Sequence, residues 1–348
     1  MTGGPHTSQT RWRGIAATWG VAAAGVVGAL VAARLFEQAV PQIHLKQRLT
    51  ASSALVAARD FARTHQLPFP EGRTAVRFAE DDSLQLFLEL ASPGGKAALD
   101  TAAVGRDIAL FRWTVRALTP GDVHETRVRL APDGRVTGFW RRFAEADRRP
   151  ELDSATARAL ATEVLVNWLG KVRAEWTLVA ASRAVEPTSA RVNWSFTFEH
   201  RTRRVAGAPL RTDVDIAGDL PSGAREHVII PETFARRYAA MRSSNELLAQ
   251  FAALGFPLYG LIALVALYRA QRRGEARWRP AIAVAAVIAG LMAASMANDI
   301  PLSWFTYPTS APPGVFLLQQ ALAALLVPLV FGAFLVVVLA GEIGRAHV

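Results

Sequence analysis

Four long apolar stretches interrupt the polar pattern of this 348-residue chain, and each predicts a helix that crosses a membrane. The clearest, 247–268, contains no charged residue and is followed by five arginines between positions 269 and 279. Because about 20 residues rising ~1.5 Å each cover the hydrocarbon core of a bilayer, a stretch of this length can span it. The predicted transmembrane helices cover residues 14–34, 247–268, 281–297 and 315–340.

The basic residues beside these stretches predict their orientation, because loops rich in Lys and Arg stay in the cytoplasm. Arginines precede the first stretch and fill the loop 269–280, whereas the outer loop 298–314 contains neither Lys nor Arg. We therefore expect a multi-pass protein of the bacterial inner (plasma) membrane. Both termini, including a tail at 1–13, would be cytoplasmic, and 35–246 would be extracytoplasmic. The first stretch is longer than the apolar region of a usual signal peptide, which favours an uncleaved helix.

The outer loop 298–314 combines prolines with aromatic residues. It contains four prolines, which we expect to exclude helix, and three aromatic residues suited to a membrane interface. The aromatic residues are Trp304, Phe305 and Tyr307, and the prolines are Pro301, Pro308, Pro312 and Pro313.

Between 35 and 246 the pattern becomes periodic and predicts an α+β domain. In its first part, 35–150, apolar residues recur at helical spacing over 47–65, with Ser52 or Ser53 as the N-cap. Asp82 is expected to cap a second helix. Alternation of apolar and polar residues with period two predicts strands. These strands cover 73–78, 111–117, 125–130 and 135–141.

The second part, 151–230, repeats this order. Asp153 precedes a helical pattern that extends to Leu169, and four alternating segments follow it. These predicted strands cover 177–186, 191–200, 210–216 and 226–230. The repetition suggests an internal duplication, with two lobes that each pack a helix on an antiparallel sheet. The pattern is similar to small modules of PepSY or cystatin type. A polar juxtamembrane helix, 231–246, would connect the second lobe to the membrane.

Composition excludes some classes of function. The chain has 39 basic and 29 acidic residues, a net charge of +10, but half of the surplus flanks the apolar stretches and the rest is scattered. This distribution argues against a nucleic-acid partner. The chain contains no cysteine, which rules out disulfides, thiol catalysis and metal sites built on thiolates.

The chain offers no motif for catalysis, cofactor binding or metal binding, so we predict no site residue of these kinds. The histidines lack ligand spacing, and we expect each to lie at the surface or in a turn; they are His6, His44, His65, His124, His200, His227 and His347. Other charged groups have simple structural explanations. Asp81 and Asp82 are suited to the start of a helix, and Asp213 and Asp215 to the solvated face of a strand. Arg201, Arg203 and Arg204 are suited to a solvated hairpin. Asn298 and Asp299 are suited to a membrane interface.

Three segments carry a resemblance to a known family. They are Phe111-Arg-Trp-Thr-Val-Arg116, Pro132-Asp-Gly-Arg-Val136 and the run from Phe234 to Glu246. Together with the cysteine-free duplicated domain, they resemble the region ahead of the membrane core in long bacterial CPBP-family (CAAX-prenyl-protease-like, Abi) intramembrane proteases. The family's catalytic signature, Glu-Glu-x-x-x-Arg followed by Phe-x-x-x-His and His-x-x-x-Asn/Asp, is absent from this chain. The resemblance therefore implies catalytic helices, with a divalent metal in the full-length protein, beyond Val348.

The last seven residues have an unusual sequence. Glu-Ile-Gly-Arg-Ala-His-Val, 342–348, can be encoded by the bases of a common sequencing adapter, whose next codon is a stop. We expect that the native reading frame leaves its own DNA at about Gly341. The alternative is a genuine cytoplasmic tail of seven residues.

These observations leave three functional hypotheses. In the first, the chain is the N-terminal sensory or regulatory part of a CPBP-like intramembrane peptidase whose catalytic helices are missing here. In the second, it is a complete, non-enzymatic, membrane-anchored sensor or binding protein. The third is an accessory subunit of a transporter. All three expect the lipid bilayer as a partner, and the first two expect a peptide or protein ligand on the extracytoplasmic domain.

Overall fold

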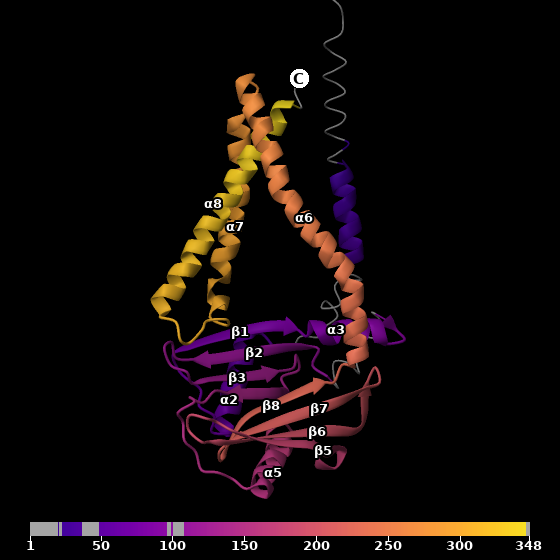
Figure 1. Cartoon of the computed structure of the whole chain (residues 1–348), viewed down its shortest axis with the longest axis vertical. Helices are drawn as coiled ribbons and strands as arrows, with labels where there is room; N and C mark the ends of the chain where they lie inside the picture. Colours follow the sequence, from indigo (N-terminus) through magenta and orange to yellow (C-terminus); the bar gives the residue numbers. More distant parts are fainter. Residues whose placement is uncertain (1–19, 21–22, 37–48, 96–98, 100–107, 346–348) are drawn as a thin grey trace, which may run out of the picture.

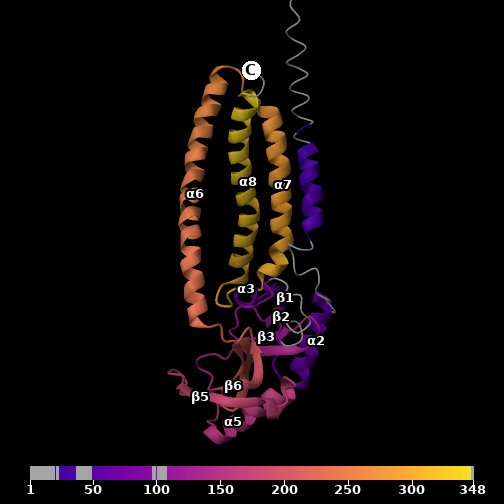
Figure 2. The same cartoon turned by 90° about the vertical axis from the view of Figure 1, so that its right-hand side faces the viewer.

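A β-sheet domain lies at one end of the molecule, and three long helices extend from it (Figure 1, Figure 2). The structure is a computed structural model that describes residues 20, 23–36, 49–95, 99 and 108–345. Within the domain, β1 lies nearest to the long helices and α5 lies at the far end (Figure 1). The tail predicted at 1–13 and the last three residues of the chain lie outside the described residues.

All eight predicted strands are present, and they form one antiparallel sheet in the order β1-β2-β3-β4-β8-β7-β6-β5. Strand β6 extends five residues beyond the predicted end, and β8 lies earlier than predicted, at 220–228 instead of 226–230. The strands are β1 (Arg73–Glu80), β2 (Phe111–Leu118), β3 (Glu125–Leu130), β4 (Val136–Arg141), β5 (Trp176–Val185), β6 (Val192–Val205), β7 (Ala208–Ala217) and β8 (Leu220–Val228). We call β1–β4 the first half of the sheet and β5–β8 the second half.

The two predicted lobes are therefore continuous with each other. The last strands of the two halves pair with each other, with Phe139 of β4 opposite Ala224 of β8. The pairing is tight, because a Cβ added at Gly138 would lie 2.4 Å from the Ala224 carbonyl oxygen. Only glycine allows the two backbones to approach this closely. The halves thus meet at a seam in the middle of the sheet.

Helices cover one face of this sheet and bury its apolar side chains. They are α2 (Ala51–Thr64), α3 (Asp82–Ala91) and α5 (Ser154–Glu163), which continues as a π-helical turn, η3 (Val164–Trp168). Alanines of α2 and α5 are fully buried against the strands, as the helical spacing predicts. The two halves share this core at an aromatic cluster in which Phe61 and Trp168 both pack on Phe139, with ring centroids 5.8 and 5.2 Å away.

Two helix caps differ by one or more residues from the prediction. Thr50 caps α2, since its hydroxyl accepts from the Ser53 N–H at 3.2 Å and the Ser53 hydroxyl accepts from the Thr50 N–H at 2.7 Å. Asp81, and not Asp82, caps α3 by accepting from the Leu84 N–H at 3.2 Å. Asp153 caps α5 as predicted, because its side chain accepts hydrogen bonds from the N–H groups of Ala155 and Thr156.

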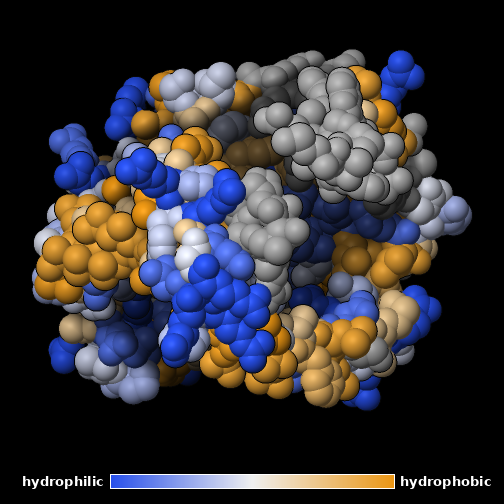
Figure 3. All heavy atoms as spheres, turned by 90° about the horizontal axis from the view of Figure 1, so that it is seen from above, coloured by the Kyte–Doolittle hydropathy of each residue, from blue (hydrophilic) through white to orange (hydrophobic). Residues whose placement is uncertain are grey.

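Three helices are long and apolar enough to cross a membrane: α6 (Glu232–Arg272), α7 (Trp278–Ser303) and α8 (Pro313–Arg345). The first 15 residues of α6 are the predicted juxtamembrane helix, which continues without a break into the span. The described part of the first predicted span is a shorter apolar helix, Ala23–Phe36, so a fourth crossing stays a prediction. Viewed from the far end of the long helices, a hydrophilic patch lies beside hydrophobic surface (Figure 3).

The outer loop is shorter than predicted, because Pro301 lies inside α7. The expectation that this proline excludes helix is wrong: it lies in the last turn, where the missing N–H removes a single hydrogen bond. Pro313 begins α8, where no partner for its nitrogen is needed. Asn298 and Asp299 are exposed side chains of α7, and the connection to α8 is reduced to 304–312.

The long helices attach to the sheet domain at two places. At the start of α6, Phe234 packs edge-on against Phe87 of α3, with ring centroids 5.1 Å apart. At the other end of β1, the loop 304–312 packs on β1 and β2 and buries Trp304 and Tyr307. Helices α6 and α8 also contact each other at their far ends, where a Cβ at Gly341 would lie 3.2 Å from the Leu267 nitrogen. The long helices are thus fixed to the sheet on both sides.

Candidate ligand-binding site

The sheet face opposite α2 and α5 carries polar side chains and contains a cavity of about 350 Å³. The cavity lies over the seam and extends from β3 to β6. Its volume is in the range that suits a small ligand. The lining residues are Arg127, Arg129, Phe139, Trp140, Ser195, Asp213, Asp215, Gly223, Ala224 and Arg225.

Three arginines give this cavity a positive side. Arg127 donates to Glu125 at 2.9 Å, and Arg225 lies 3.5 Å from Asp213. The guanidinium of Arg129 makes no hydrogen bond or ion pair with any residue that the structure describes. Burial, together with the like charges of Arg112, Arg225 and Arg127, lowers the pKa of Arg129 to about 10. Arg129 is therefore a partly desolvated cation among other cations.

Two aspartates of β7 lie on the opposite side of the cavity. Asp213 accepts from the Thr197 hydroxyl at 2.8 Å and lies 3.6 Å from the His227 ring. Burial raises the pKa of the Asp215 carboxyl, and neighbouring Asp213 raises it further. The expectation that both aspartates lie on a fully solvated face is therefore wrong. They are half-buried groups in a shared polar cavity.

The floor and one wall of the cavity come from the seam. Gly223 faces Trp140 across the β4–β8 pair, so no side chain fills the space above it. A Cβ at Gly223 would meet Phe139, Asp215 and Trp140 at ordinary distances of 3.4–3.6 Å. A second hollow, of about 320 Å³, continues on the other side of Trp140. The half-exposed indole therefore offers a flat apolar surface to both hollows.

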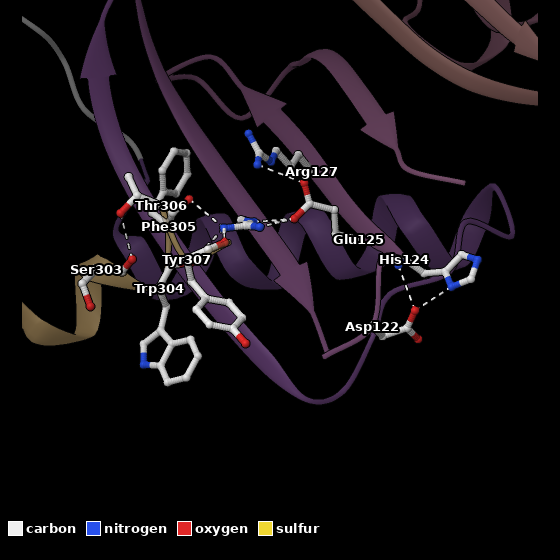
Figure 4. A network of polar contacts seen from close by, with 10 residues as sticks. Asp122, His124, Glu125, Arg127, Ser303, Trp304, Phe305, Thr306 and Tyr307 are labelled. Carbon is white, nitrogen blue, oxygen red and sulfur yellow. Dashed lines mark hydrogen bonds and ion pairs between the residues drawn. The ribbon is translucent and has the colours of Figure 1, made fainter. Parts of the chain in front are cut away.

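The loop 304–312 covers the neighbouring part of the same sheet face, where a buried arginine holds it. The Arg116 guanidinium donates to the carbonyls of Trp304, Phe305 and Tyr307 at 3.1, 2.9 and 2.8 Å. It also pairs with Glu125, to which its Nε donates at 2.7 Å. Both side chains of this pair are almost fully buried, at 4% and 1% exposure. Figure 4 shows the loop residues and Glu125 on opposite sides of this hydrogen-bond network.

Arg127 connects the cavity to this docked loop. Its guanidinium lies over the Trp140 ring at 5.3 Å and within 5.9 Å of the Phe305 ring centroid. It also donates to the same Glu125 carboxylate that binds Arg116 (Figure 4). A continuous set of contacts therefore runs from the cavity through Arg127, Glu125 and Arg116 to the backbone that joins α7 and α8. Sequence reasoning missed Arg116 and Arg127, although the charged residues that alternate with apolar ones along β2 and β3 were a visible signal.

A separate polar bridge lies beyond β2 and β3. His124 contacts Asp122 at 2.7 Å and Asp147 at 3.0 Å through its two ring nitrogens. The hydrogen bonds to Asp147 and Asp122 raise the pKa of His124. The bridge is half-exposed and joins the β2–β3 turn to the segment that links the two halves. We interpret it as a structural clip.

The remaining residues weighed from the sequence do not form a site. His200 is buried against Trp176 with ring centroids 5.1 Å apart, so its prediction as a surface or turn residue is wrong. Arg201, Arg203 and Arg204 lie exposed on the extended end of β6. Asp81 is a helix cap that also accepts from Arg112 at 2.9 Å. Among the described residues, no group of three His, Asp or Glu side chains is arranged to hold a metal ion.

Comparison with known proteins gives no further assignment. No family model, curated protein or solved structure matches the chain. The resemblance to CPBP proteases and the analogy with PepSY or cystatin modules therefore stay predictions.

Proposed function

We propose that this chain is a membrane-anchored receptor whose extracytoplasmic sheet binds a ligand at the seam and passes the event to its membrane helices. The observation that carries the proposal is the position of Arg127. This side chain lines the cavity and also binds the carboxylate that fixes Arg116 under the loop 304–312. A ligand in the cavity therefore contacts a residue that belongs to the loop's attachment.

The physical basis of the coupling is competition for charge. The buried carboxylate of Glu125 binds two guanidiniums, that of the buried Arg116 and that of Arg127, whose side chain is 34% exposed. A ligand that engages Arg127 weakens its bond to Glu125 and so changes how strongly that carboxylate holds Arg116. Charge-assisted hydrogen bonds in such surroundings are strong enough to shift a two-state equilibrium of the loop. The loop joins α7 and α8, so its displacement acts on both helices.

The proposal includes the orientation of the protein. The arginines between α6 and α7 favour a cytoplasmic position for that connection, which makes the sheet domain extracytoplasmic. Because the chain has no cysteine, single cysteines report on this without background. A cysteine at the exposed turn residue Thr188 should react with an impermeant maleimide in intact cells, and one at Glu275 should react only after lysis. The opposite pattern would overturn the orientation.

The target of the receptor has two candidates. If the CPBP resemblance holds, the receptor would act on catalytic helices encoded beyond residue 348. In the alternative, the chain is a complete, non-enzymatic sensor. Long-read sequencing of the source DNA across the 3′ end of the gene separates them. A frame that continues into an apolar helix with Glu-Glu-x-x-x-Arg supports the peptidase. A native stop codon near residue 348 contradicts it and leaves the sensor.

A reporter on the docked loop tests the receptor function itself. Thr306 is exposed within the loop, so a Thr306→Cys variant can carry an environment-sensitive fluorophore in nanodiscs. The probe panel comprises inorganic phosphate, succinate, glycine, putrescine and glucose. We expect at least one compound to change the fluorescence in this variant and to lose that effect when Arg127→Met is added. If no compound changes the signal, or if the response survives Arg127→Met, the proposal is wrong.

A further inference from the structure

The charge balance of the cavity has a consequence for its ligand. The three arginine side chains that line it face two acids, and one of these, Asp215, lies partly desolvated beside the other. Arg127 and Arg225 have acidic partners in Glu125 and Asp213, but Arg129 has none among the described residues. Burial lowers the pKa of Arg129 most, the charges of Arg112, Arg225 and Arg127 lower it further, and only the charge of Asp81 acts in the opposite direction. The cavity therefore has unused positive charge and unused hydrogen-bond donors at Arg129.

We propose that the cavity binds the anionic oxygen group, a carboxylate or a phosphate, of a soluble small molecule, with Arg129 as its main partner. This inference deepens the proposed function and rests on it, because it names the ligand chemistry of the same cavity. An anion at this place satisfies the donors of Arg129 and offsets the repulsion among Arg112, Arg127 and Arg225.

The geometry suits such a group. A guanidinium presents a planar set of donors that matches the two oxygens of a carboxylate or a phosphate. The absent side chain at Gly223 leaves the floor open, so that a ligand can approach the strands. Trp140 forms a flat wall to which the apolar part of the ligand can pack. A volume of about 350 Å³ admits a molecule somewhat larger than the anionic group alone.

Position in the sheet favours a soluble anion over a lipid headgroup. The cavity begins at β3, and β1 is the strand nearest to the membrane helices (Figure 1). Neighbouring strands lie about 4.8 Å apart, so the cavity starts about 10 Å beyond β1. The loop 304–312 also covers the part of the face that lies closer to the bilayer. A headgroup would have to leave the bilayer surface to reach Arg129.

Titration calorimetry on the full chain in phosphatidylcholine nanodiscs tests this inference. The probes are inorganic phosphate and succinate, each titrated separately, with putrescine as the cationic counterpart. We expect at least one of the two anions to bind and putrescine not to bind. Arg129→Met should lower the affinity for that anion by about tenfold or more, as expected for the loss of charge-assisted hydrogen bonds. Arg129→Lys keeps the charge and should lose less affinity.

Matched variants separate a site from a general effect of charge. Arg183→Met removes an arginine from the far strand β5, where it pairs with Glu151 at 2.9 Å, and gives the same net charge as Arg129→Met. Arg183→Met should leave anion binding unchanged, and Arg225→Met should weaken it. Should Arg129→Met fail to fold, Arg225→Met serves as the decisive cavity variant. The inference is overturned if neither anion binds, or if the cavity variants bind as tightly as Arg183→Met.

The lipid source has its own arm. Replacing a third of the phosphatidylcholine by phosphatidylglycerol supplies anionic headgroups without free phosphate. The negative surface of these nanodiscs changes the apparent anion affinity of the wild type and of Arg183→Met alike, so Arg183→Met measures that general effect. We expect the wild type to show no loss of anion affinity beyond the loss seen in Arg183→Met. A loss of binding in the wild type that exceeds the loss in Arg183→Met would show that headgroups occupy the cavity, which overturns the soluble source.

Failure of this inference can be told from failure of the receptor function. A cavity that binds putrescine or glucose and moves the Thr306 reporter would overturn the anionic ligand and leave the receptor function standing. A cavity that binds phosphate with an Arg129 dependence but never moves the reporter would support the anionic ligand and overturn the receptor function.

Discussion

The two halves of the sheet share an order of elements but differ in the chemistry of their open face. Each half begins with a helix and continues as four antiparallel strands, with α3 inserted only in the first. The open face of the first half is dominated by arginines, with Glu125 among them, whereas that of the second half combines acids and hydroxyls with Arg211 and Arg225. The side chains concerned are Arg77, Arg112, Arg116, Arg127 and Arg129 in the first half, and Ser195, Thr197, Asp213 and Asp215 in the second.

This difference separates two tasks within one framework. Arginines of the first half hold the loop 304–312 through its carbonyls and aromatic rings, with Arg77 over Phe305 at 4.3 Å and Arg73 over Trp304 at 5.2 Å. The second half makes no such contact with the long helices in the part of the chain that the structure describes, and its face stays open. The cavity lies where the two meet. Attachment to the long helices and the proposed binding of a ligand therefore use neighbouring parts of one face.

The largest effect is expected in the attachment of the first half. Arg116→Met should destabilise the sheet domain by about 3–5 kcal/mol, because it leaves Glu125 buried without its main partner. Urea unfolding of the full chain in nanodiscs, followed by tryptophan fluorescence, measures this. Adding Glu125→Met to Arg116→Met should cost less than the sum of the single changes, since no unpaired charge remains.

The matched change in the second half is Arg183→Met. Its partner is Glu151, and both side chains are about half-exposed, so the loss should be at most about 1 kcal/mol. Equal destabilisation by Arg116→Met and Arg183→Met would contradict the view that only the first half carries a buried attachment.

The seam between the halves comes next. Gly138→Ala should destabilise the domain by about 1–3 kcal/mol, because the new Cβ would lie 2.4 Å from the backbone oxygen of Ala224 and force the strands apart. Gly223→Ala is the control on the opposite strand, where the Cβ meets its neighbours at 3.4 Å or more. The same unfolding assay compares them. A seam that tolerates both changes equally is looser than the structure describes.

A smaller effect, of opposite sign, is expected on the acidic side of the cavity. Burial raises the pKa of Asp215 above its unfolded value of 3.8, so ionisation of this group destabilises the folded state at neutral pH. Asp215→Asn should therefore be more stable than the wild type at pH 7. The difference should shrink as pH falls through the raised pKa. A variant that is less stable at pH 7 would show that the carboxylate has a stabilising partner.

The smallest effect concerns the clip formed by Asp122, His124 and Asp147. The pKa of His124 is raised, so its contribution is fully present below about 6.5 and is lost as pH rises through the raised value. The pKa values of both aspartates are lowered, so their contribution is lost as pH falls through those values, below 3.8. His124→Gln should cost most stability between these limits. A pH-independent cost would rule out the charged bridge.

Local patterns predicted the elements of this fold well, because strand alternation and helical spacing are properties of neighbouring residues. All eight strands and the helices beginning near Thr50, Asp81 and Asp153 follow from such patterns. The pairing of β4 with β8 does not, since it joins residues that are about 85 positions apart and depends on the fit of Gly138 against another backbone. This pairing converts two predicted lobes into one sheet.

The candidate site was largely hidden from sequence reasoning for a related reason. Arg116 alternates with apolar residues like a solvated side chain, and only the arrival of 304–312 from a distant segment buries it. Asp213 and Asp215 similarly look like a solvated strand face until β8 and β4 are placed beside β7. The density of charge on β2 and β3 was the one available signal. Charge alone, however, does not indicate which side chains are enclosed.

The most direct test of the account is whether the cavity and the loop are coupled without any ligand. We would measure the rate at which a cysteine at Thr306 reacts with a maleimide in nanodiscs, in the presence of Arg127→Met or of Arg225→Met. Both changes remove an arginine from the cavity, but only Arg127 contacts Glu125 and Phe305. The account predicts that Arg127→Met changes the rate several-fold and that Arg225→Met leaves it unchanged. Equal rates in the two variants would contradict a connection from the cavity to the membrane helices.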